Sequence, residues 1–124
     1  MLHIPGLYIV DTEDKGRGIF TSEQLTKGDI IELCPILKIP SGQLQLLDKT
    51  IIYEYYFLWK EEGYEACFAL GYGSLYNHSP HPNAEILLDY VDQMIKFSAI
   101  QDIEAGSEIS IDYQDGNRDL KLWF

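Results

Sequence analysis

The stretch GYGSLYNHSPHPN at residues 71–83 is the most unusual part of this 124-residue sequence. It holds two each of glycine, proline, histidine, asparagine, serine and tyrosine. Short amide and imidazole groups on a proline-fixed turn have donors and acceptors locked in direction, which suits the binding of a polar small molecule. The same composition is also typical of a polar turn whose Asn and Ser side chains bond their own backbone. Composition alone leaves both interpretations open.

Two shorter motifs flank this stretch along the chain. KGRGIF at residues 15–20 places two glycines in a loop of the kind that approaches a ligand, but it lacks the third glycine and the strand-to-helix context of a phosphate-binding fingerprint. EISIDY at residues 108–113 ends a short alternating strand on Asp112 and Tyr113, which alone fit a solvated carboxylate and a core or rim aromatic. Each motif is weak alone, whereas all three in this order are specific.

Together the segments KGRGIF (15–20), LYNHSPHPNA (75–84) and IEAGSEISIDY (103–113) resemble the signature motifs of the SET domain, the fold of S-adenosylmethionine-dependent protein lysine methyltransferases. The likeness covers nearly the whole chain, and the compact form resembles the minimal SET proteins of large DNA viruses and bacteria, which lack zinc-bearing flanks. It implies a mainly β, β-clip-like fold of several small curved sheets. A C-terminal pseudoknot would bring Asn77 and His78 to Asp112 and Tyr113.

The resemblance also implies which residues form the site. Tyr113 is the expected catalytic residue, because its hydroxyl would orient the lysine amine and the sulfonium methyl group for in-line transfer. Ile111 stands where relatives often have Phe or Tyr, so the number of methyl groups added stays open. The expected substrate-channel residues are Tyr72, Tyr76 and Ile111. The expected S-adenosylmethionine-binding residues are Lys15, Gly16, Arg17, Gly18, Tyr55, Asn77 and His78.

Charge and cysteine content narrow the classes of partner and cofactor. A net charge of −11 disfavours nucleic acid and anionic membranes as partners and favours a basic, lysine-containing protein or peptide. Cys34 and Cys67 lie in apolar stretches and are expected to be buried free thiols. His78 and His81 are three residues apart without further ligands at zinc-site spacing, so no metal site is predicted.

The chain reads mainly as short strands within one domain. Residues 84–90 and 94–99 predict a hairpin, while residues 29–33 and 36–39 predict two strands separated by Pro35. Apolar residues spaced by three or four predict one short amphipathic helix near residues 43–60, although that segment is rich in β-formers. We expect a SET domain at residues 1–113 with a short tail at 114–124, and the sequence shows no signal peptide or transmembrane segment, which predicts an intracellular protein, cytoplasmic or nuclear.

The functional hypothesis is therefore an enzyme that transfers methyl groups from S-adenosylmethionine to lysine side chains, with a histone or another basic protein tail as substrate. The resemblance to the viral group leaves a homodimer open. The alternative is a non-catalytic SET-like module that binds a peptide or partner. The presence of Asn77, His78 and Tyr113 favours the enzyme.

Overall fold

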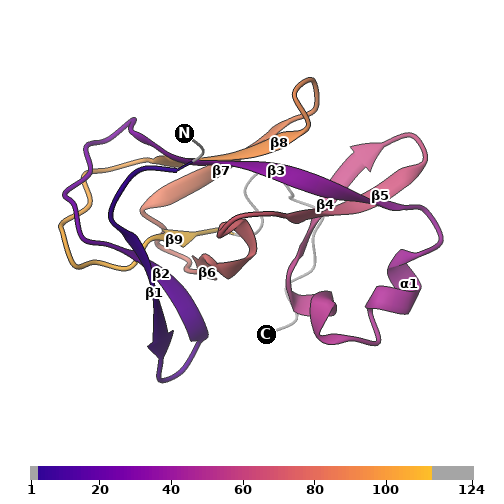
Figure 1. Ribbon diagram of the computed structural model, residues 1–124, viewed down its shortest axis with the longest axis horizontal. Helices are drawn as coiled ribbons and strands as arrows, with labels where there is room; N and C mark the ends of the chain where they lie inside the picture. Colours follow the sequence, from indigo (N-terminus) through magenta and orange to yellow (C-terminus); the bar gives the residue numbers. More distant parts are fainter. Residues whose placement is uncertain (1–2, 113–124) are drawn as a thin grey trace.

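The computed structural model of the chain describes residues 3–112, which form short strands, one α-helical turn and two 3-10 turns (Figure 1). In chain order these elements are β1 (Leu7–Thr12), β2 (Gly16–Thr21), β3 (Ile30–Pro40), α1 (Leu44–Leu47), η1 (Ile51–Glu54), β4 (Tyr56–Glu61), β5 (Tyr64–Ala69), η2 (Gly73–Leu75), β6 (Asn77–His78), β7 (Ala84–Asp89), β8 (Met94–Ala99) and β9 (Ser110–Ile111). The predicted mainly β architecture of small curved sheets is confirmed.

The largest sheet has five antiparallel strands in the order β4-β5-β3-β8-β7. Strand β3 is continuous through Pro35, so the prediction of two separate strands there is wrong. Pro35 is tolerated because β3 changes partner at this point: residues up to Pro35 pair with β8, and residues from Ile36 pair with β5. The predicted hairpin of β7 and β8 is confirmed.

The segment between β3 and β4 corrects the prediction of a helix running through residues 43–60. Only Leu44–Leu47 is α-helical, and it is followed by the 3-10 turn η1 and by strand β4. The β-forming residues Tyr56 and Phe57 pair with β5, and both are buried there. Sheet pairing therefore overrides the helical spacing, as tertiary context commonly does for aromatic and β-branched sequences.

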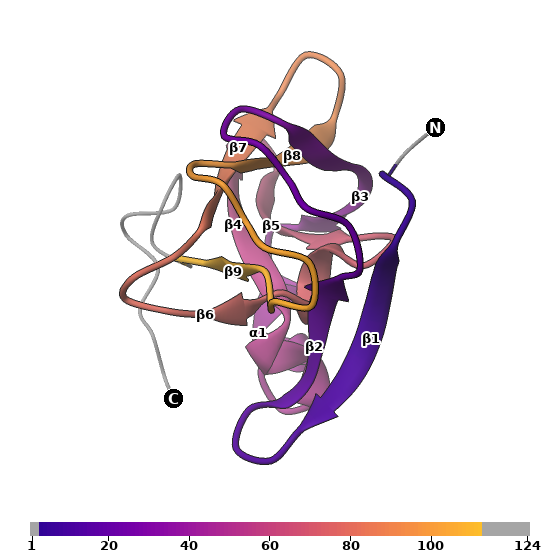
Figure 2. The same cartoon turned by 90° about the vertical axis from the view of Figure 1, so that its left-hand side faces the viewer.

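The C-terminal part of the described chain is inserted between two earlier segments (Figure 2). The backbone N–H of Ile109 donates to the Ile19 carbonyl at 2.8 Å, and the N–H of Thr21 donates to the Ser107 carbonyl at 3.1 Å. Directly after Ile109, β9 pairs in parallel with β6, which places Ser110 opposite Asn77. Residues 107–111 thus join β2 to β6, which the pseudoknot expected from the resemblance requires.

A single main core lies beneath these sheets and contains both cysteines. Cys34 and Cys67 are buried and free, as predicted. Burial raises the pKa of the Cys67 thiol to about 12 and raises that of Cys34 as well, so both remain protonated and unreactive at neutral pH. Within residues 3–112 the helical turns are too short and too polar to cross a bilayer.

Candidate functional site

Three motifs that are far apart in sequence meet where β2, β6 and the residues before β9 come together. The Asn77 side-chain amide donates from Nδ2 to Glu108 Oε2 at 2.7 Å. Gly18 on β2 faces this pair, because a Cβ placed there would lie 2.7 Å from Asn77 Nδ2 and would overlap Glu108 Oε2. Glycine at position 18 therefore lets the β2 backbone approach the amide–carboxylate pair.

Asn83 holds the third motif in place from the other side. Its Nδ2 donates to the Glu108 backbone carbonyl at 2.9 Å, and its Oδ1 accepts from the Ser110 backbone N–H at 2.8 Å. One side chain thus satisfies a backbone carbonyl and a backbone N–H on either side of Ile109. The second asparagine of the NHSPHPN stretch is a clamp for β9.

His78 and Asp112 form the next layer of the same junction. His78 lies opposite Ile111 in the β6–β9 pair, and its Nδ1 is 3.7 Å from Asp112 Oδ1. The His78 side chain is 17% exposed, so its ring is mostly covered by protein while one part reaches solvent. The predicted approach of Asn77 and His78 to Asp112 is confirmed, whereas Tyr113 lies outside the described residues.

The other predicted cofactor residues lie further from this junction. Lys15, Gly16 and Arg17 are exposed around the turn between β1 and β2, and Gly16 has the positive φ of 73° that this turn requires. Tyr55 is half-buried and ends η1, in the segment between β3 and β4. The β1–β2 hairpin and α1 lie on opposite sides of the molecule in the view of Figure 1. The roles of these four residues in cofactor binding remain predictions.

The three predicted channel residues differ in their exposure. Ile111 is fully buried, and Tyr72 is half-buried with its ring centroid 5.5 Å from that of His3. Tyr76 is fully buried, and its hydroxyl donates to Glu32 Oε1 at 2.7 Å. Desolvation, followed by the nearby Glu32 carboxylate, raises the pKa of Tyr76 well above its usual value. Tyr76 is therefore a neutral hydrogen-bond donor.

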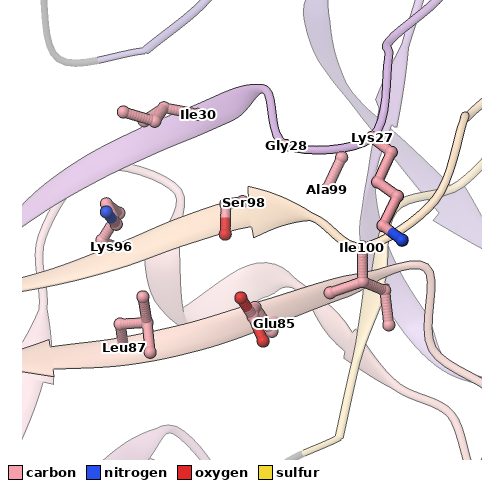
Figure 3. Close-up of a pocket in the computed structure, with 9 residues that line it drawn as sticks. All are labelled: Lys27, Gly28, Ile30, Glu85, Leu87, Lys96, Ser98, Ala99 and Ile100. Carbon is pink, nitrogen blue, oxygen red and sulfur yellow. The ribbon is translucent and has the colours of Figure 1, made fainter.

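A cavity of about 620 Å³ lies elsewhere, over the outer face of β7 and β8 (Figure 3). Its lining combines the charged side chains of Lys27, Glu85 and Lys96 with exposed apolar side chains such as Ile30 and Leu87. None of the residues predicted for the site lines it. We therefore locate the candidate site at the Gly18–Asn77–Glu108 junction.

A protein-family model described as "SET domain" matches residues 16–114, which is most of the chain. The chain is a SET domain protein. This SET domain is 34% identical over 119 residues to a Schizosaccharomyces pombe histone-lysine N-methyltransferase, described as H3 lysine-37 specific, covering 95% of this chain and 76% of that protein. It is also 36% identical over 104 residues to the Gallus gallus protein-lysine N-trimethyltransferase SMYD5, covering 81% of this chain and 24% of that protein.

Solved structures show the same fold. A Plasmodium falciparum candidate histone methyltransferase superposes with a TM-score of 0.69 at 30% identity, covering 87% of this SET domain and 92% of that chain. The Neurospora histone lysine methyltransferase DIM-5 superposes with a TM-score of 0.68 at 22% identity, covering 90% and 53% of the two chains, and this likeness supports the fold alone. The relatives are thus named lysine methyltransferases, and the fold is that of SET methyltransferases.

Sequence reasoning missed the roles of Glu108 and Asn83. Both residues lie within the motifs that carry the resemblance, but their partners are 31 and 25 or more residues away in sequence. A third missed residue is Glu32, whose buried carboxylate accepts from Tyr76. Its sequence context, a single acid in an apolar strand, gave no signal of this contact.

Proposed function

We propose that this SET domain is an S-adenosylmethionine-dependent methyltransferase that methylates the side-chain amine of lysine in a protein substrate. The observation that carries the proposal is the convergence of Gly18, Asn77 and Glu108 from three separate motifs. Directional polar groups that meet beside a glycine backbone are suited to binding a polar ligand in one orientation. The names of the relatives, both protein-lysine methyltransferases, support this class of reaction.

The chemistry of the junction fits the cofactor that the family uses. S-adenosylmethionine supplies an activated methyl group on a positively charged sulfonium, together with an ammonium, a carboxylate and an adenosine. The carboxylates of Glu108 and Asp112 suit its cationic groups, and the exposed cations Lys15 and Arg17 suit its carboxylate. Asn77 and His78 add donors and acceptors of fixed direction at the junction.

Positioning is the main contribution that the chain's own residues can make, because the methyl donor is already activated. Tyr113 is expected to orient the lysine amine, and Tyr72 and Ile111 to form apolar walls near it. An apolar, tyrosine-lined channel disfavours the ammonium form of the incoming lysine, so it promotes the loss of the proton that must precede attack. Tyr76 is expected to support this wall from the core.

The substrate class follows from charge. A SET domain with a net charge of −11 attracts basic segments over long range, and attracts nucleic acid poorly. We therefore propose a lysine-rich protein tail, such as a histone tail, as the substrate. The resemblance-based expectation of a homodimer is checked by light scattering of the purified protein.

The decisive experiment measures transfer of labelled methyl groups to a panel of basic proteins, followed by mass spectrometry of the modified site. Wild-type protein should bind S-adenosylmethionine in calorimetry and label lysine. Tyr113→Phe should lower turnover by roughly 100-fold, because removing one positioning hydroxyl misaligns the reacting atoms. Tyr90→Phe is the matched control, since Tyr90 lies on the β7–β8 hairpin, where its hydroxyl accepts from the Lys60 N–H.

Two outcomes would contradict the proposal. Wild-type protein that binds no S-adenosylmethionine at millimolar concentration is not a methyltransferase of this class. Protein that binds the cofactor but labels no lysine in the panel supports the non-catalytic binding module instead.

A further inference from the structure

The SET domain contains a buried carboxylate outside the candidate cofactor junction. Glu32 on β3 is 2% exposed. Its Oε2 accepts from the Tyr72 backbone N–H at 3.0 Å, and its Oε1 accepts from the Tyr76 hydroxyl at 2.7 Å. A buried carboxylate is expensive unless hydrogen bonds replace its hydration, so these contacts are required by burial itself.

Glu32 faces the core because of an irregularity in β3. The register with β8 shifts between Ile30, which pairs with Ser98, and Glu32, which pairs with Phe97. Ile31 is the additional residue, and both Ile31 and Glu32 are consequently buried. A bulge of this kind redirects a side chain that regular alternation would place on the other face.

The two hydrogen bonds hold both ends of one short turn. Tyr72 precedes the 3-10 turn η2, and Tyr76 follows it directly before β6. The turn packs closely on β3, because a Cβ on Gly71 would overlap Glu32 Oε2 and one on Gly73 would lie 2.9 Å from Cys34 Sγ. Two glycines therefore bring the turn within reach of the carboxylate.

Tyr76 has little freedom to move in this arrangement. Its ring stacks on Phe97 of β8 with centroids 4.5 Å apart and planes inclined by 25°. Its hydroxyl is fixed at the same time by Glu32. The next residue is Asn77, whose side chain bonds Glu108, so the backbone that presents Asn77 and His78 starts from an anchored residue.

We propose that Glu32 is a positioning residue: its carboxylate fixes the Tyr72–Tyr76 turn to β3 and thereby sets the placement of Asn77 and His78 at the cofactor junction. The part of this inference that concerns the cofactor rests on the proposed function. The structural part does not, because it concerns the contact between β6 and β9, which the Ser79 N–H closes by donating to the Ile111 carbonyl at 2.8 Å.

The test uses Glu32→Gln, Tyr76→Phe, their double variant and the control Cys67→Ala, all in the full chain. The control shortens a fully buried side chain of β5 and leaves Glu32 and both tyrosines in place. One readout is hydrogen exchange of the Ser79 amide relative to the core amide of Ile95, which separates local opening from global unfolding. The other readout is the Kd for S-adenosylmethionine below the melting temperature of every variant.

Each single variant should increase the relative exchange of Ser79 about tenfold and weaken cofactor binding by a similar factor, as expected for the loss of one buried hydrogen bond. Tyr76→Phe retains the ring and tests the contact if Glu32→Gln fails to fold. The double variant should be no worse than the worse single variant, since both remove the same contact. Cys67→Ala should lower the melting temperature without changing either readout.

Unchanged relative exchange in folded Glu32→Gln and Tyr76→Phe would overturn the proposal, as would additive effects in the double variant. A change in exchange without a change in Kd would overturn its link to the cofactor. If the wild-type protein binds no cofactor, the proposed function fails, and the exchange measurement still decides whether Glu32 positions β6.

Discussion

Two carboxylates of this SET domain, Glu32 and Glu61, differ in their burial and in the groups that donate hydrogen bonds to them. Glu32 is buried against the turn that leads to Asn77 and accepts from two neutral donors, a backbone N–H and a tyrosine hydroxyl. Glu61 ends β4 with 29% of its side chain exposed, and it is paired with Lys38 Nζ at 2.8 Å. Its other oxygen accepts from Trp59 Nε1 at 3.1 Å and from Gln93 Nε2 at 3.2 Å.

The difference shows how the surroundings decide what a carboxylate does. An exposed ion pair contributes little to stability and is screened by salt, so the Glu61 cluster mainly joins the β4–β5 hairpin to the β7–β8 turn. Hydrogen bonds from neutral donors in the water-free core orient the carboxylate that accepts them. Removing the acceptor leaves buried donors unsatisfied, which costs stability. Glu32 is therefore suited to positioning, and Glu61 to tethering two hairpin ends.

The largest expected effect comes from removing the buried carboxylate, Glu32. Glu32→Ala leaves the Tyr76 hydroxyl and the Tyr72 N–H without their acceptor in the core, which should reduce the free energy of unfolding by about 3 kcal/mol. Glu61→Ala should reduce it much less, because water can replace the lost contacts. Urea unfolding followed by circular dichroism measures both.

Glu104→Ala is the baseline for these variants, since it removes an exposed negative charge from a chain of net charge −11. An effect of Glu61→Ala as large as that of Glu32→Ala would show that the distinction between positioning and tethering is wrong. Near-neutral behaviour of Glu32→Ala would have the same consequence.

The next prediction tests whether the Gly18–Asn77–Glu108 junction is packed as closely as the Tyr72–Tyr76 turn that Glu32 holds. Gly18→Ala places a methyl group against Glu108 Oε2 and Asn77 Nδ2. The overpacking should lower stability by about 1–3 kcal/mol. Cofactor affinity should fall at least tenfold, because the Asn77–Glu108 pair must separate. Calorimetry with S-adenosylmethionine measures the affinity, and differential scanning calorimetry the stability.

Gly42→Ala is the matched control for this substitution. Gly42 has a φ of 93° and no atom within 4 Å of an added Cβ, so alanine there introduces backbone strain without a clash and lies in the turn before α1. Its melting temperature should fall while the cofactor affinity is kept. If Gly18→Ala binds the cofactor like wild type, the fitted junction does not contribute to binding.

The sequence predicted local structure correctly where its apolar spacing fitted only one type of secondary structure. The hairpin of β7 and β8 follows from alternating residues around a short polar turn, and the structure has it. The helix expected near residues 43–60 failed because its apolar spacing also fits a turn followed by a strand, and Phe57 gains more from pairing opposite Cys67 on β5. Such a choice depends on partners that are distant in sequence.

Site residues could be predicted from the sequence only where they lie within a motif that resembles the SET family. Gly18 and Asn77 were named because they lie in segments that resemble SET motifs, and the structure brings them together. Glu32 carries no motif, and simple alternation through Ile31, Glu32 and Leu33 places its side chain on the face opposite to theirs. The bulge at Ile31, which turns Glu32 into the core, is set by the pairing of β3 with β8 and has no local signature.

The smallest expected effect concerns the exposed member of the comparison and depends on pH. Hydrogen bonds from Lys38, Trp59 and Gln93 lower the pKa of Glu61 from 4.5 to about 2 in the folded protein. Because the folded pKa is the lower one, the stabilisation by Glu61 is fully present above pH 4.5 and is lost as the pH falls towards 2. The difference in melting temperature between wild type and Glu61→Gln should therefore shrink between pH 6 and pH 3.

Glu104→Gln corrects for the change in net charge, and 0.5 M salt should reduce the difference at pH 6 by screening the Lys38 ion pair. A difference in melting temperature that stays constant with pH would show that the negative charge of Glu61 does not contribute to stability. The contrast between Glu61 and Glu32 would then rest on their burial and not on charge.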